Sequence, residues 1–117
     1  MNIPSDMEEK YVAAAVAHGM ETEKGNHKEI NKQYNKLTRI YRRMEKDKAL
    51  GKEMTAKLLN HSSDFVRAWA AAHALGLEVN VDKAVEVLEH IAKTKGLVRL
   101  DAEMTLQVWR EQGYLKF

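Results

Sequence analysis

Apolar residues recur every three or four positions along most of this chain, and short polar stretches rich in Gly, Asn and Ser separate the periodic segments. The clearest segment carries apolar side chains spaced four, three, four and three positions apart, at Ile30, Tyr34, Leu37, Tyr41 and Met44. At about 100° per residue these side chains share one narrow face of a helix. Valine, isoleucine and aromatic residues never alternate with polar ones over a useful length, which gives strands little support. The pattern therefore predicts an all-α protein.

The periodic segments and their polar boundaries predict about six helices. We expect these helices at about 6–22, 27–48, 52–60, 64–75, 81–95 and 102–112. The expected N-caps are Ser5 (in a capping box with Glu8), Asn26, Ser62 or Ser63, Asn80 and Asp101. Glycines are expected in the turns or at the helix ends, at Gly25, Gly51, Gly76, Gly96 and Gly113.

The stretch 58–75 is the most informative, because it combines a helix end, a tight polar turn and a second helix with small inward residues. This arrangement is typical of a HEAT-type helical hairpin. Short turns between all the predicted helices extend the same interpretation to the whole chain. We therefore predict one domain over residues 1–117, an all-α, HEAT/ARM-like α-α superhelix of about six helices in antiparallel hairpins.

Three blocks of sequence carry a resemblance to a known family. They are residues 13–15 through 31–34, residues 64–73, and residues 101–106 together with Trp109 and Arg110. In these blocks the chain resembles a small bacterial, all-helical, HEAT-like family of unknown function, the two-thousand-nineteenth domain of unknown function. The resemblance implies a HEAT-like fold in a bacterial cytosolic protein, and it implies no activity or catalytic residue. Proteins of this shape are also similar to some immunity proteins that neutralise toxins.

Several conspicuous side chains are expected to serve the fold. Asp64 and Arg67 lie three positions apart and share a helix face, and we expect Arg67 to join one hairpin to the next through Asp101 or Glu103. The alternative role for Arg67 is to hold a phosphate or a partner's carboxylate. Core packing is the expected role of Trp69 and Trp109, with base stacking as the alternative. We expect His73, which lies among alanines, to be an interior histidine bonded to a carbonyl or carboxylate.

The residue types needed for catalysis or metal binding are scarce. The chain has no cysteine, which excludes disulfides, thiolate zinc sites and cysteine nucleophiles. Its five histidines never lie four positions apart, and each of its serines, Ser5, Ser62 and Ser63, is explained as a cap. We predict no catalytic residue, no metal and no cofactor. The chain also lacks a membrane-spanning apolar run and a signal-peptide pattern, so we expect a cytoplasmic protein.

Charge is distributed unevenly along the chain. Residues 26–52 contain nine Lys or Arg against three Asp or Glu, a local charge of +6, which leaves −4 for the rest because the total is +2. Six of these cations share one face of the second predicted helix: Lys28, Lys32, Lys36, Arg39, Arg43 and Lys46. We predict a non-catalytic protein–protein interaction module, monomeric or homodimeric, whose basic face attracts a partner with an acidic surface. The alternatives are a toxin-neutralising immunity protein, a nucleic-acid-binding helical-repeat protein, and a basic face that serves only solubility.

Overall fold

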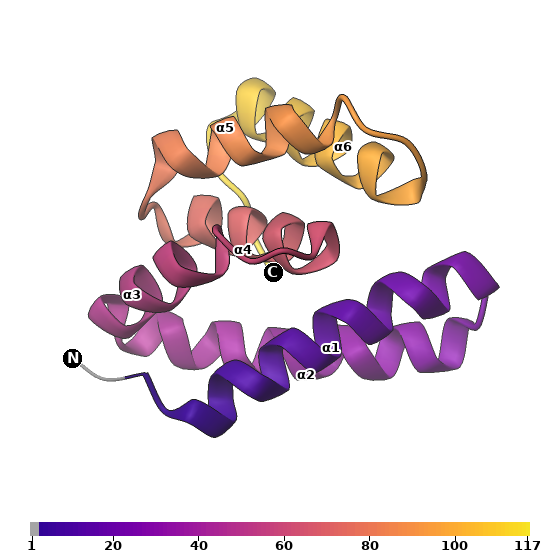
Figure 1. Cartoon of the computed structure of the whole chain (residues 1–117). Helices are drawn as coiled ribbons and strands as arrows, with labels where there is room; N and C mark the ends of the chain where they lie inside the picture. Colours follow the sequence, from indigo (N-terminus) through magenta and orange to yellow (C-terminus); the bar gives the residue numbers. More distant parts are fainter. Residues whose placement is uncertain (1–2) are drawn as a thin grey trace.

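The computed structural model describes residues 3–117, and over this range the chain forms helices and turns without a strand. The six helices are α1 (Ser5–Lys24), α2 (His27–Lys46), α3 (Lys48–Leu58), α4 (Asp64–Leu77), α5 (Val81–Ile91) and α6 (Leu97–Gln112). The predicted all-α class is therefore confirmed. In Figure 1, α1 and α2 lie side by side as a long hairpin, α5 and α6 lie on the opposite side of the molecule, and α4 lies between these two pairs.

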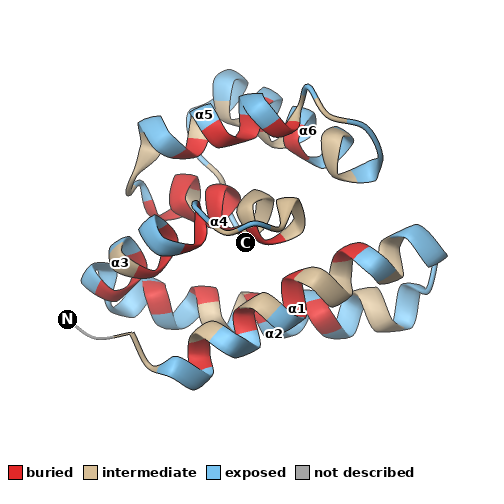
Figure 2. Cartoon of the chain, viewed as in Figure 1, coloured by how far each residue is buried: buried red, intermediate tan, exposed pale blue. Residues whose placement is uncertain are grey.

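Helix α4 is the centre of the fold, because it packs against each of the other five helices. Its sequence explains this position. Alanine at 70, 71 and 74 is buried, as are Val66 and Leu75, and small side chains let neighbouring helices approach closely. Figure 2 shows buried residues along most of α4, whereas the outer helices alternate between buried and exposed positions.

An aromatic cluster surrounds the middle of α4. The ring of His73 is fully buried and packs against the rings of Tyr11, Tyr41, Trp69 and Phe117. Its Nδ1 atom forms a hydrogen bond of 2.7 Å with the Tyr11 hydroxyl. The prediction of an interior histidine is confirmed. The predicted partner is wrong, because a hydroxyl from another helix takes the place of a carbonyl or carboxylate.

The corner between α2 and α3 lies earlier in the chain than the sequence predicts. Helix α2 ends at Lys46, and the Asp47 side chain then caps α3 by accepting a hydrogen bond from the Leu50 backbone N–H at 3.2 Å. Gly51, which was expected to stop a helix, is buried inside α3. A Cβ atom at this position would lie 2.9 Å from Cδ1 of Leu77. The glycine therefore permits close packing between α3 and α4.

Gly76 has a similar role inside α4. This helix runs one residue past Gly76, to Leu77, and the C-cap residue Glu78 then adopts the left-handed conformation. A Cβ atom at Gly76 would lie 2.6 Å from the Tyr41 hydroxyl oxygen and 2.9 Å from a ring carbon of Phe117. The prediction that Gly76 ends the helix is therefore wrong, because this glycine lies inside α4 and makes room for Tyr41 and Phe117. Gly25 and Gly113, by contrast, do follow helix ends with positive φ values of 72° and 80°, and these two predictions are confirmed.

The predicted N-caps have mixed outcomes. Asn26 accepts from the backbone of α2, and Ser63 accepts from the Val66 N–H at the start of α4. Asn80 occupies the N-cap position of α5, but its side chain donates to the Lys52 carbonyl at 2.9 Å and makes no capping bond. The capping box at Ser5 is wrong, because the residue before it takes the N-cap position and no side chain caps α1.

The expected cap at Asp101 is also wrong. Helix α6 begins at Leu97, so Asp101 lies inside the helix. Gly96, which has a positive φ of 95°, precedes the first helical residue. The turn therefore ends earlier than the Asp101 cap signal indicated.

Ion pairs connect some helices, but not through the residues that the sequence singled out. Arg67 pairs with Asp64 within α4, and Glu103 pairs with Arg99 within α6 at 2.9 Å. The prediction that Arg67 joins two hairpins through Asp101 or Glu103 is therefore wrong, because partners on the same helix satisfy these charges locally. Pairs between helices within residues 3–117 include Lys57 with Glu8 and Arg110 with Glu89, each at 2.8 Å.

Candidate binding surfaces

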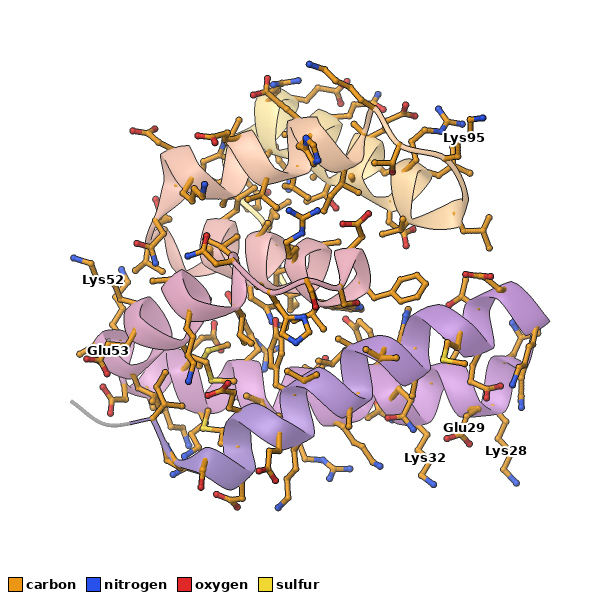
Figure 3. All side chains as sticks on the ribbon, viewed as in Figure 1. Lys28, Glu29, Lys32, Lys52, Glu53 and Lys95 are labelled. Atoms are coloured by element: carbon orange, nitrogen blue, oxygen red, sulfur yellow. The ribbon has the colours of Figure 1, made fainter. Side chains whose placement is uncertain are left out.

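The basic face of α2 is exposed to solvent. All six predicted contact residues, Lys28, Lys32, Lys36, Arg39, Arg43 and Lys46, are exposed. The ion pairs found between described residues include none of them. Figure 3 shows Lys28 and Lys32 pointing from α2 away from α4, α5 and α6. The face therefore offers positive charge to solvent.

Three of these cations line a groove between α1 and α2. The groove has a volume of about 630 Å³. Its lining is Asp6, Met7, Lys10, Ala13, Ala14, Ala17, Gln33, Lys36, Arg39, Ile40 and Arg43. The structure therefore brings Lys36, Arg39 and Arg43 together on one wall. Lys28, Lys32 and Lys46 lie outside the lining, along the same exposed face of α2.

The groove exists because the two helices carry side chains of different length. Alanine at positions 13, 14 and 17 of α1 leaves space beside the long side chains of α2. Gln33 is buried at this junction and donates a hydrogen bond to Glu29 at 2.8 Å. On the α1 side, Lys10 lies 3.7 Å from Asp6, an exposed pair that contributes little to stability. The result is an apolar floor with a cationic wall on the α2 side, whereas the α1 side carries the Lys10–Asp6 pair.

A second cavity lies at the other side of α4 from α5, where α1, α2, α4 and α6 converge with Phe117. It has a volume of about 350 Å³. Its lining is His18, Gly19, Tyr34, Phe65, Ala68, Trp69, Ala72, Val98, Asp101, Met104, Thr105 and Phe117. We call this cavity the aromatic pocket. Trp69, which was predicted as a core residue, is half-buried and forms one of its walls, whereas Trp109 is half-buried against the core.

The rings of the aromatic pocket meet at steep angles. The centroids of His18 and Trp69 are 5.1 Å apart with the ring planes at 84°, and those of Tyr34 and Trp69 are 5.9 Å apart at 59°. The first is an edge-to-face contact, which is favourable because the positive edge of one ring meets the negative face of the other, and the second is tilted. The rings therefore form the walls of the pocket. Because they do not stack flat against one another, the space between them stays open.

Two titratable groups in the lining of this pocket, His18 and Asp101, affect each other's pKa. Burial lowers the pKa of His18, and the charge of Asp101 opposes that shift. Burial also raises the pKa of Asp101, although the residue is exposed at the edge of the pocket, and His18 opposes that shift in turn. Sequence reasoning missed this pair. Each residue is ordinary in its own helix, and only the packing of α1 and α6 against α4 brings them together.

Within residues 3–117, His, Asp and Glu side chains form no group of three or more that could hold a metal ion. None of the helices in this range is both long and apolar enough to cross a bilayer.

Comparison with protein-family models, curated proteins and solved structures gives no significant match. The resemblance to the small HEAT-like family therefore stays a prediction.

Proposed function

We propose that this protein is a non-catalytic binding module that holds an acidic segment of another protein in the groove between α1 and α2. The observation that carries this proposal is the combination of Lys36, Arg39 and Arg43 on one wall with an apolar floor of alanines. We also propose that the helices form a HEAT-like superhelix. The contacts of α1 with α2, of α3 with α4, and of α5 with α6 support such a pairing.

The shape and charge of the groove favour an amphipathic acidic helix as the occupant. An amphipathic helix binds a groove by placing its apolar side chains on the floor. Here the floor is formed by Ala13, Ala17 and Ile40. Carboxylates beside that apolar stripe would face Arg39 and Arg43, and complementary charge speeds association and sets the register of the partner. An acidic partner also explains why these cations have no described ion-pair partner within the chain itself.

The proposal is tested with a fluorescent, glutamate-rich amphipathic peptide of about 20 residues and with a duplex DNA of similar length. The variant K36E/R39E reverses two charges in the groove. The matched control K93E/K95E makes the same change in net charge in the turn between α5 and α6, where Figure 3 shows Lys95 far from α1 and α2. We expect anisotropy titrations to show peptide binding that K36E/R39E weakens by about tenfold or more, with the control within about twofold of the parent.

Three results would contradict the proposal. Absence of peptide binding, or equal losses in both variants, would leave the basic face as a solubility feature. DNA binding that is tighter than peptide binding, and that falls by about a thousandfold between 50 and 200 mM salt, would instead favour the nucleic-acid alternative.

A further inference from the structure

We propose that the aromatic pocket binds the cationic head group of a quaternary or methylated ammonium compound. The proposal concerns a different site from the groove between α1 and α2, and it does not depend on the function proposed for that groove. It is based on the ring lining of the pocket, on the charge of its rim and on its open shape.

Most of the large side chains that line the pocket are aromatic. Tyr34, Phe65, Trp69 and Phe117 contribute rings from α2, α4 and the end of the described chain, and the imidazole of His18 faces Trp69. A methylated ammonium ion is attracted to the negative face of such rings and loses little hydration on entering an apolar site, because its methyl groups cover the charge. Rings held at steep angles can contact the ion from several sides.

The charges around the pocket favour a cation over an anion. Asp101 is the carboxylate of the lining, and the lining contains neither lysine nor arginine. Burial lowers the pKa of His18, which favours the neutral imidazole. The pocket thus has a single negative group at its rim, which can approach an ammonium ion. An anionic ligand would meet repulsion from Asp101 and no compensating positive charge.

The pocket is open and large enough for such a group. Its volume of about 350 Å³ leaves space for a trimethylammonium group together with part of the chain that carries it. Apolar side chains stay unusually exposed at its edge, with Tyr34 at 37% and Met104 at 64%. Gly19 helps to form the wall, because a Cβ atom there would overlap the ring of Phe65. A ligand that covers these side chains would remove apolar surface from water.

The shared chemistry could come from a free small molecule or from a methylated lysine side chain of another protein. Choline and tetramethylammonium are the probes for the first source. A short peptide with trimethyllysine, paired with the same peptide carrying unmodified lysine, is the probe for the second. Tighter binding of the trimethyllysine peptide than of choline, by about tenfold, identifies a protein side chain as the ligand. Equal or tighter binding of choline identifies a free compound.

The decisive measurement separates charge from shape. The alcohol 3,3-dimethylbutan-1-ol has the shape of choline without its charge. NMR titrations that follow the Trp69 indole N–H and the His18 ring should show choline binding with a dissociation constant of about 1 mM or below, and the neutral alcohol should bind at least about fivefold more weakly. Equal binding of the two compounds would overturn the proposal, as would the absence of shifts at about 20 mM of every cationic probe.

Substitutions locate the site. D101N and Y34L should each weaken choline binding by about fivefold or more, because one removes the negative charge and the other removes a ring. E111Q is the matched control, since Glu111 is an exposed carboxylate of the same helix that lies outside the lining. Circular dichroism and thermal unfolding verify that each variant is folded. If folded D101N and Y34L bind choline as the parent does, the aromatic pocket is not the binding site.

Discussion

At the scale of single residues, His73 links the packing of the centre to pH. Burial lowers its pKa from 6.5 to about 3, and the charge of Arg42 adds to that shift. The unfolded chain therefore takes up the proton first as the pH falls. The low pKa of His73 therefore contributes to the free energy of unfolding above pH 6.5. This contribution is lost progressively as the pH falls from 6.5 to about 3. From His73 alone we expect the free energy of unfolding to fall by about 1.2 kcal/mol between pH 7 and pH 5.5. Urea unfolding at pH 7 and at pH 5.5 measures this change.

The control is the double variant Y11F/H73L, which removes both partners of the hydrogen bond and leaves no orphaned polar group in the centre. This variant should lose most of the pH dependence in that interval. Part of the dependence is expected to stay, because burial lowers the pKa of His18 in the same direction. A double variant with the full pH dependence of the parent would show that His73 is not its source.

Residues differ in how much of their role the sequence reveals. His73 lies among alanines on a helical face, so its burial could be predicted from neighbours in the sequence. Its partner could not, because Tyr11 comes from α1 and only the packing of α1 on α4 brings the two rings together. Arg67 shows the opposite case. Its partner Asp64 is local and was visible at a spacing of three residues, and the predicted long-range partners were not needed.

At the scale of helices, the side-chain caps set where α3 and α4 begin. Asp47 accepts from the Leu50 N–H, and Ser63 accepts from the Val66 N–H. We expect D47A and S63A each to lower the free energy of unfolding by about 1 kcal/mol, because each leaves a helix N–H group without its partner. Ser5 makes no capping bond, so S5A should stay within about 0.5 kcal/mol of the parent.

Chemical denaturation of these three variants at one pH gives the comparison. Equal losses in S5A and S63A would mean that Ser5 does cap α1 in solution, as the sequence pattern of a capping box predicts. The comparison therefore tests directly whether the Ser5 side chain caps α1.

Glycine explains two of the errors in the predicted helix boundaries, those at Gly51 and Gly76. A glycine favours a helix end when it adopts positive φ, as Gly25 and Gly113 do. It also occurs inside a helix where another element approaches closely, as Gly51 and Gly76 do. Sequence spacing alone does not separate the two cases, because the deciding fact is the position of Leu77 or Tyr41 in three dimensions. Periodicity still located all of the helices in the described range.

At the scale of the whole molecule, the fold class was predictable and the aromatic pocket was not. Helical periodicity reports which residues face inward, and that information is sufficient for an all-α class. The pocket needs residues from α1, α2, α4 and α6 at once, and no local pattern marks such a convergence. The basic groove is intermediate, since the cations of α2 were predicted from spacing, but the alanine floor contributed by α1 was not.

The central position of α4 predicts how the molecule opens. Because α4 contacts each of the other five helices, its buried amides can exchange only when most of the fold is lost. We therefore expect native-state hydrogen exchange to give amides around Ala70 and Leu75 a protection free energy equal to that of global unfolding by urea. The first turn of α1, which no side chain caps, should open locally at a lower free energy. Slower exchange in α1 and α2 than in α4 would contradict this expectation, because it would show that the long hairpin is stable without the helix on which it packs.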